Sequence, residues 1–278
     1  MNKKGILDLD WFLLLPVLIL VTISLVTLFS VSFDLFKSQF VFLIISFAAY
    51  LFFSQSNYKI LKVYSIPIYI ISLILLLIVF FLGIEARGSV RWVEFLGFRI
   101  QFSEILKPFL AISLATYVTN NQNFDLKSFF KIFLFLAPIS FLIFIQPDLG
   151  TSLIYTGVVL VTIIYLGFPL RYFLALFLPF IISIPFIWNI LHDYQKQRVL
   201  TFIDPSKDPL GTSYNVIQSV IAVGSGMIMG RGLGQGTQSG LRFLPERHTD
   251  FIFATISEQL GFIGSTIVII AFGFFLYK

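Results

Sequence analysis

The stretch FIFATISEQLGFIGSTIVIIAFGFFLY, Phe251–Tyr277, carries a single charged residue, Glu258. A helix needs about 20 predominantly apolar residues to cross a membrane. Because this stretch meets that requirement, we predict that it forms a membrane-spanning helix. Further segments have the same character, and 104–119 is the weakest of them: 11–33, 36–53, 60–84, 104–119, 129–146, 151–167 and 170–190.

The composition of the whole chain supports the same conclusion. Hydrophobic residues make up 58% of the sequence and charged residues 12%, and the mean hydropathy is +0.94. So few polar residues cannot cover the surface of a water-soluble globule. We therefore predict an all-α polytopic membrane protein with about eight transmembrane helices and a large outer loop between the seventh and the eighth.

Cysteine and histidine usage excludes several kinds of chemistry. The chain has no cysteine, and its histidines are His192 and His248. Disulfides, thiolate catalysis and cysteine-ligated or histidine-rich metal sites are therefore excluded. The net charge of +5 does not indicate nucleic-acid binding, because the basic residues are scattered rather than gathered in one stripe.

The placement of lysine and arginine predicts the orientation in the membrane. With a cytoplasmic N-terminus, the inner connections are mainly basic, in agreement with the positive-inside rule. Their charged residues are Lys3, Lys4, Lys59, Lys62, Lys127, Lys131, Arg171 and Lys278, against Asp8, Asp10 and Asp125. The first apolar segment exceeds the roughly 7–15 residues of a signal-peptide core, so we expect it to be retained as a span.

Most other charges fall in two predicted outer loops, 85–103 and 191–250. The second loop has about 60 residues, and connections of that length commonly bind or catalyse. We therefore expect function to face outward. The domain prediction is a single transmembrane domain over residues 1–278, with 191–250 as its extracytoplasmic loop.

The first outer loop leads into a helix that begins with charged residues. Ser103 is suited to the N-cap position. Glu104 and Lys107 then lie three residues apart on one helical face, where they can form an ion pair. The spacing leaves two interpretations open: a packing pair that fixes the helix, or a pair that lines an outward cavity.

Two further groups also allow a structural and a functional interpretation. Taken alone, Arg87, Arg91 and Trp92 favour anchoring at the membrane interface. Pro147 ends one helix and Asp148 can cap the next. Asp148 can equally face the same outward cavity as Glu104, because acids near membrane depth are rarely tolerated without a role.

The second outer loop contains a short amphipathic stretch, 214–223, which includes Gln218 and is followed by closely spaced glycines from Gly224 to Gly236. These glycines do not form a nucleotide-binding loop, since no Gly-Lys-Ser/Thr ending and no preceding strand accompany them. We predict a re-entrant or surface-hugging loop whose backbone approaches other helices, because non-helical backbone at membrane depth must be covered.

Motifs in this loop resemble a known family. The sequence GQGTQS at 234–239 is followed by FLPERHTDFIF at 243–253. With these motifs the chain closely resembles the SEDS (shape, elongation, division and sporulation) membrane proteins, and the pairing of GTQS with PERH favours the elongation branch over the division branch. Further matching motifs run in family order: 88–92, 102–104 with Lys107, 147–151, Gln195 with Arg198, and 218–219.

The resemblance implies a peptidoglycan glycosyltransferase of the bacterial cytoplasmic membrane. It would polymerise lipid II on the outer leaflet, release undecaprenyl pyrophosphate, and work with a class B penicillin-binding protein, a transpeptidase. Asp250 is the expected general base, although an aspartate there can also simply cap the last helix. The expected substrate-binding residues are Arg87, Arg91, Trp92, Glu104, Lys107, Asp148, Arg198, Gln218, Arg231, Glu246, His248 and Glu258.

A divalent cation such as Mg²⁺ could share the stabilisation of the pyrophosphate, with Asp148, Glu104 or Asp250 as its candidate ligands. No other cofactor is expected.

The chain departs from the family pattern in two respects. Family members have ten spans, whereas this chain ends at Lys278 after the eighth expected span, so we expect a truncated or divergent form. The usual Glu-Glu-Leu-Gly is replaced by EQLG at 258–261, so Gln259 cannot act as a base.

Two other functions stay open from the sequence: a flippase for lipid-linked sugars, and a catalytically silent scaffold for cell-wall enzymes. A flippase needs polar groups accessible from both sides in turn. The charges here lie on the outer side and the inner connections are short, which argues against that alternative.

Overall fold

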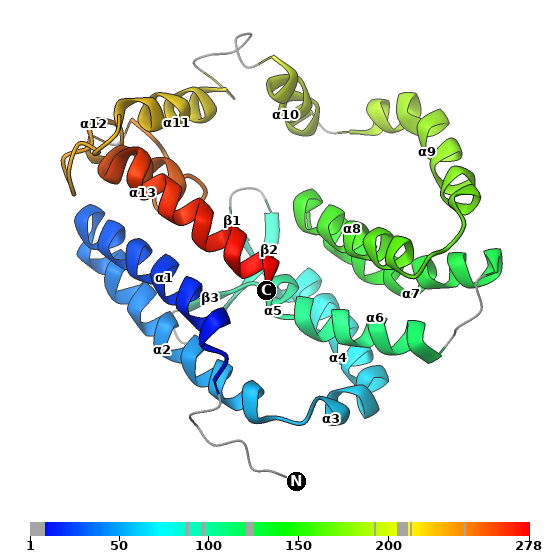
Figure 1. Cartoon of the computed structure of the whole chain (residues 1–278). Coiled ribbons are helices and arrows are strands. Elements are labelled where there is room, and N and C mark those ends of the chain that lie inside the picture. Colours follow the sequence, from blue (N-terminus) through cyan, green and yellow to red (C-terminus); the bar gives the residue numbers. More distant parts are fainter. Residues whose placement is uncertain are drawn as a thin grey trace. The chain divides into compact units, whose positions relative to one another are not determined.

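The computed structural model describes residues 9–86, 89–95, 98–120, 125–191, 193–204, 211, 213–241 and 243–278, and it is dominated by helices (Figure 1). Among the described residues, six helices are long and apolar enough to cross a membrane. The prediction of a polytopic helical membrane protein is thus confirmed. These helices are α1 (Trp11–Val31), α2 (Phe33–Gln55), α4 (Ser65–Leu82), α7 (Leu126–Ile145), α9 (Leu170–Ile190) and α13 (Ile252–Tyr277).

The remaining predicted spans are shorter or divided. The segment predicted at 151–167 forms α8 (Leu149–Tyr165), an apolar helix of 17 residues. The segment predicted at 104–119 is divided into α5 (Phe102–Ile105) and α6 (Lys107–Asn120). The division lies at Leu106, two residues before Pro108, which has no backbone N–H to donate to the carbonyl four residues earlier. The predicted third span is similarly divided into α3 (Tyr58–Val63) and α4.

Aspartates begin three of the apolar helices. Asp10 accepts a hydrogen bond from the backbone N–H of Phe12 at 3.1 Å, and Asp125 accepts one from Ser128 at 3.0 Å. Asp148 does the same for α8. These carboxylates satisfy N–H groups that the first turn of a helix leaves unpaired. Hydrogen bonds from the Ser128 hydroxyl and backbone N–H lower the pKa of Asp125 from its usual value, so the cap stays ionised at neutral pH.

The chain divides into two compact units, Met1–Ser56 with Phe186–Lys278, and Asn57–Pro185. Each is described below by itself, as the first and the second unit. The prediction of a single transmembrane domain stays a prediction.

The second unit is built around helices α4, α6, α7 and α8. Its core is almost entirely aliphatic and aromatic, with Phe129 at its centre in edge contact with Phe130, Phe168 and Phe173. Leu76, Leu110, Ile139 and Ile163 are buried to 1% exposure or less. The polar residues discussed below are therefore supported by tightly packed helices.

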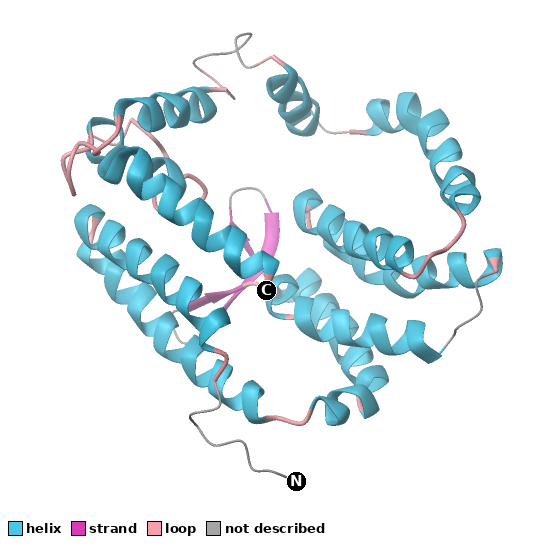
Figure 2. Cartoon of the chain, viewed as in Figure 1, coloured by secondary structure: helices cyan, strands magenta, loops and turns pink. Residues whose placement is uncertain are grey.

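A small antiparallel sheet follows α4 in the second unit, shown in magenta in Figure 2. Its strands are β1 (Ile84–Ala86), β2 (Ser89–Phe95) and β3 (Phe98–Ile100), with β2 in the middle. Trp92 lies opposite Ile84, and Val93 lies opposite Ile100. These strands were not expected from the sequence, because β1 and β3 have three residues each and the alternation in β2 is interrupted where Trp92 and Val93 stand side by side.

In the first unit α13 packs against α1 and against α11 (Tyr214–Ser225). Figure 1 shows α13 in red beside α1 in blue. The unit also contains α10 (Asp193–Ile203) and the short α12 (Thr237–Gly240). Helix α11 covers the amphipathic stretch expected at 214–223. A small buried cluster of Ala222, Leu244 and Ala254, with Phe251 packed on it, joins α11 to the start of α13.

Helix α13 is broken at Gly261, which has φ 67° and ψ −159°. The segment 226–232 pairs with the backbone on both sides of the break. The N–H groups of Phe262 and Ile263 donate to the carbonyls of Met227 and Ile228 at 2.8 and 3.3 Å. In the opposite direction, Arg231 and Gly232 donate to the carbonyls of Glu258 and Gln259 at 2.9 and 3.1 Å. The glycine-rich loop therefore approaches another helix through its backbone, as the sequence predicts.

The backbone pairing between the segment 226–232 and α13 requires a glycine at Gly230. Its φ is +82°, and a Cβ atom there would overlap the backbone carbonyl of Gln259. We expect Gly230→Ala to destabilise the protein by more than about 1 kcal/mol, because both the backbone conformation and the space are incompatible with a side chain.

Gly224→Ala is the matched control, because nothing lies within 4 Å of the Cβ position in that helical residue. It should leave stability unchanged or raise it by up to about 1 kcal/mol. Thermal unfolding of both variants in detergent measures the difference in stability. Equal unfolding midpoints would show that the close backbone pairing of 226–232 with α13 does not require glycine at this position.

Candidate functional site

A polar network in the second unit centres on Asp148, which is 6% exposed. Its Oδ2 accepts a hydrogen bond from Gln101 Nε2 at 2.8 Å and lies 3.3 Å from Arg91 Nη1. The sheet presents Arg91 from β2, and Gln101 precedes α5. A buried carboxylate is costly unless it is paired and hydrogen-bonded, and here it has both kinds of partner.

Thr151 extends this network to a second acid. Its hydroxyl lies 3.0 Å from Asp148 Oδ2 and 3.5 Å from Glu104 Oε1. Lys107 Nζ lies 2.6 Å from both Glu104 oxygens. The side chains of Glu104 and Lys107 are 49% and 31% exposed. Thr151 thus links Asp148 to Glu104, and the Glu104 side chain is half exposed.

Asp148 performs the capping role weighed from the sequence, and a role in an outward cavity stays a prediction. It is the N-cap of α8, with Oδ1 accepting from the backbone N–H of Thr151 at 3.2 Å. The prediction that Ser103 is an N-cap is wrong. Gln101 holds that position, while Ser103 lies buried inside α5, where its carbonyl accepts a hydrogen bond from the Tyr155 hydroxyl at 2.8 Å.

Sequence reasoning missed Gln101 and Thr151 as members of this network. The sequence does indicate a contact for Thr151, because it stands three residues after a capping aspartate, where the backbone N–H donates to the side chain of the cap. Gln101 had none, since its contact with Asp148 spans 47 residues.

The turn at 246–251 in the first unit carries Asp250. Glu246, with φ 50°, accepts backbone hydrogen bonds at its carbonyl from Thr249 at 3.1 Å and Phe251 at 3.2 Å. The Thr255 hydroxyl donates to the carbonyl of Arg247 at 2.8 Å. The backbone around Asp250 is therefore held in place.

The Asp250 carboxylate itself is exposed and makes no hydrogen bond or ion pair with any residue that the structure describes. Helix α13 starts after it, with Phe251 at the N-cap and no side-chain cap. Asp250 therefore does not act as the helix cap that the sequence allowed as an alternative. It is a free acceptor on a fixed turn.

Glu258, expected to bind substrate, is instead fully buried. Its oxygens accept hydrogen bonds from the backbone N–H groups of Gln238 at 2.7 Å and Ser239 at 2.9 Å, with the Thr237 hydroxyl at 3.4 Å. In this position the carboxylate supports α12 and does not face a ligand. Direct substrate contact by Glu258 therefore has no geometric support.

The remaining expected site residues vary in their surroundings. Arg231 is exposed, and its Nε donates to the carbonyl of Ser225 at 3.0 Å. His248, Glu246 and Gln218 are half-buried, as is Trp92 on β2. Arg87 lies outside the described residues, and the side chain of Arg198, on α10, does too.

The metal-binding expectation finds no preformed site. Among the described residues, no three His, Asp or Glu side chains lie close enough together to hold a metal ion. Asp148 is paired with Arg91, and Glu104 is paired with Lys107. A cation at either acid would have to compete with these positive groups, so the arrangement does not fit the predicted divalent cation.

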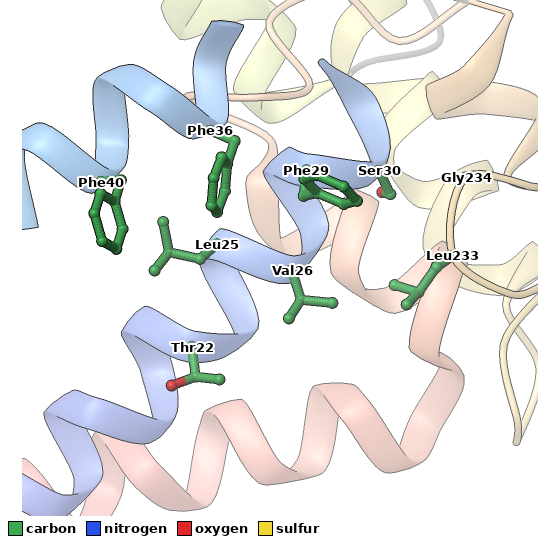
Figure 3. Close-up of a pocket in the computed structure, with 9 residues that line it drawn as sticks. All are labelled: Thr22, Leu25, Val26, Phe29, Ser30, Phe36, Phe40, Leu233 and Gly234. Atoms are coloured by element: carbon green, nitrogen blue, oxygen red, sulfur yellow. The ribbon is translucent and has the colours of Figure 1, made fainter. Parts of the chain in front are cut away.

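An apolar cavity of about 650 Å³ lies in the first unit between α1, α2 and the loop at Leu233–Gly234 (Figure 3). Its walls include Leu25 and Phe29 of α1 and Phe40 of α2, and Ser30 lies at the end nearest Gly234. A smaller apolar cavity, of about 280 Å³, lies beside Lys107 in the second unit. Apolar cavities next to polar groups are typical of binding sites for amphiphilic ligands.

Comparisons with known proteins agree with this picture. Residues 6–278 match the FtsW, RodA and SpoVE family, which is described as a cell cycle protein. The chain is 33% identical to a probable peptidoglycan glycosyltransferase FtsW of Geobacter metallireducens, over 96% of this chain and 75% of that relative. It is 39% identical to the peptidoglycan glycosyltransferase MrdB of Escherichia coli K12, over 73% of this chain and 55% of that relative.

A solved structure has the same fold. A chain of a peptidoglycan synthase complex that coordinates polymerisation and crosslinking superposes with a TM-score of 0.81, at 27% identity, over 98% of this chain and 77% of that one. The protein therefore belongs to the FtsW, RodA and SpoVE family, the SEDS membrane proteins.

Proposed function

We propose that this protein is a peptidoglycan glycosyltransferase that polymerises lipid II into glycan strands at the outer face of a bacterial cytoplasmic membrane. The observation that carries the proposal is the exposed Asp250 carboxylate, which has no partner among the described residues and stands on a turn fixed by backbone hydrogen bonds. The names of the relatives from Geobacter metallireducens and Escherichia coli support the same reaction.

The chemistry assigns one role to Asp250 and another to the cations. A sugar hydroxyl is a poor nucleophile, so a carboxylate must accept its proton as the oxygen attacks the anomeric carbon of the donor sugar. The bond from that carbon to the pyrophosphate breaks, and undecaprenyl pyrophosphate leaves with the electron pair. Positive groups stabilise the departing charge, and Arg231, exposed in the same unit as Asp250, is a described candidate.

The apolar cavity between α1 and α2 suits part of the prenyl chain of lipid II. Both helices are long and apolar enough to lie in a membrane, so the cavity opens among hydrocarbon chains. One of its walls is the loop at Leu233–Gly234, which leads directly into the 237–251 segment that carries Asp250. A chain bound there brings the head of the lipid toward that segment.

Orientation, branch and partner are parts of the same proposal. The positive-inside rule puts the N-terminus in the cytoplasm and both outer loops on the opposite side. The GTQS and PERH motifs favour a role in elongation and cell shape. A class B penicillin-binding protein is the proposed partner, since one structural relative is part of a complex that couples polymerisation to crosslinking.

Replacing Asp250 tests the central claim. Asp250→Asn keeps the size of the side chain but cannot accept a proton, so polymer formation from labelled lipid II should fall by about 10²–10⁴-fold. Expression and lipid II binding should persist. Asp193→Asn, at another exposed acid of the same loop, is the control and should polymerise normally. Normal polymer from purified Asp250→Asn protein would overturn the assignment.

The Glu104 and Lys107 pair separates activity from stability. Because both side chains are partly exposed, the ion pair contributes about 0–1 kcal/mol at most to stability. Glu104→Gln should therefore leave the unfolding midpoint nearly unchanged while lowering polymer formation at least about tenfold. A variant that is unstable but fully active for its folded fraction would show that the pair only holds the helix in place.

Cysteine labelling tests the orientation, because the native chain has no cysteine. Asp193 and Lys127 are both exposed in the structure and are predicted on opposite sides. In intact cells, an impermeant thiol reagent should label Asp193→Cys and should not label Lys127→Cys until the membrane is opened. The reverse pattern would invert the topology.

A further inference from the structure

The carboxylate of Glu258 has an unusual environment for a group in an apolar helix. It is fully buried, and the described residues that donate hydrogen bonds to it all lie in one segment, residues 237–239. No ion pair with it is present among the described residues. Burying a carboxylate is expensive unless hydrogen bonds compensate, so these contacts fix the segment firmly on α13.

The fixed segment is linked directly to the turn that carries Asp250. Gln238, which donates to Glu258, accepts at its own carbonyl from the backbone N–H of Leu244 at 3.1 Å. The Leu244 side chain is fully buried, in the cluster with Ala222 and Ala254. The start of the Asp250 turn is therefore held by a chain of contacts that begins at Glu258.

A second contact holds the same turn from the other side. Thr255, fully buried, donates its hydroxyl hydrogen bond to the carbonyl of Arg247. Thr255 and Glu258 are three residues apart on α13, and residues at that spacing share one helical face. One face of α13 thus holds the Asp250 turn in two ways. Thr255 contacts the turn directly, and Glu258 holds it indirectly through Gln238 and Leu244.

We propose that Glu258 is a positioning residue for Asp250, acting through the 237–244 segment without touching substrate. The inference rests on the proposed function in that it takes Asp250 as the base. Small misplacements of a reacting group are costly, about 10²-fold for 1 Å. The buried acid therefore sets the reaction rate through the placement of the exposed one.

Two substitutions disturb this contact from opposite sides. Glu258→Gln replaces one acceptor oxygen by an NH₂ group, which then faces a backbone N–H that has lost its acceptor. Gly236→Ala leaves Glu258 unchanged but places a methyl carbon 2.5 Å from Glu258 Oε2. Both changes should detach the segment 237–239 from the carboxylate.

The first experiment measures polymer formation from labelled lipid II by the full chain. Both variants should lower the maximal rate about 10²-fold with an unchanged KM, since Glu258 does not contact substrate. In an Asp250→Asn background, either change should cause no further loss, because a residue that acts through Asp250 has nothing left to position. Additive losses, or a raised KM at an unchanged maximal rate, would refute the proposal.

Ser265→Ala is the matched control. Ser265 is also buried on α13, and its hydroxyl bonds to Ser257 and to the carbonyl of Gly261. These contacts stay within α13, where Ser257 in turn donates to the carbonyl of Phe253, and none of them reaches residues 237–251. The variant should keep its activity within twofold although it loses buried hydrogen bonds on the same helix.

The second experiment measures the position of the Asp250 turn relative to α13 and does not depend on enzyme activity. Nitroxide labels at Asp250→Cys and at the exposed Ile269→Cys on α13 report the distance from the turn to the helix. The distance distribution should be narrow in the otherwise native chain and with Ser265→Ala, and broad with Glu258→Gln or Gly236→Ala. A narrow distribution in the last two would overturn the positioning role, even for protein that refolds poorly, because only the folded fraction gives a defined distance.

The two measurements also separate this inference from the proposed function. If the native chain forms no polymer, or if Asp250→Asn polymerises normally, the assignment of the base fails. The nitroxide distances still decide whether Glu258 fixes the turn.

Discussion

The backbone break at Gly261 is the constraint on which the first unit depends. An apolar helix at membrane depth has no water to satisfy the groups that a break releases. The segment 226–232 supplies the missing partners on both sides of the break. Once that segment is fixed, α12 and the turn that follows it have a defined position against α13. The glycines of the loop are thus needed for close approach of two backbones, and their spacing does not serve nucleotide binding.

Four acids that the structure describes are either enclosed by their partners or open at the surface, and this difference separates structural support from a chemical role. Asp148 is enclosed by Arg91, Gln101 and Thr151, and Glu258 is enclosed by backbone N–H groups. Such satisfied acids fix structure. Asp250 is exposed with no partner among the described residues, and Glu104, although paired with Lys107, keeps about half of its side chain exposed. Only acids of the second kind can exchange a proton or contact a substrate.

Sequence reasoning predicted the elements whose signals are local. The long apolar runs, the capping by Asp148 and the amphipathic stretch at 214–223 each depend on neighbouring residues, and each is found in the structure. Other contacts join residues far apart in sequence, namely those of Gln101 with Asp148 and of Glu258 with 237–239. No local sequence pattern predicts such contacts. Glu258 was therefore assigned to substrate from its motif, although its surroundings make it a structural anchor.

The hydrogen bond from Ser30 of α1 to Gln259 of α13 joins residues 229 positions apart. It closes the first unit, which draws on both ends of the chain, whereas the second unit is one continuous segment. Contacts at such separation form late, since the intervening chain must first be ordered or made. During synthesis the second unit can therefore fold early, whereas α1 can pack against α13 only after α13 has been made. The proposed base lies just before α13, so the turn that carries it is completed only when nearly the whole described chain has been inserted.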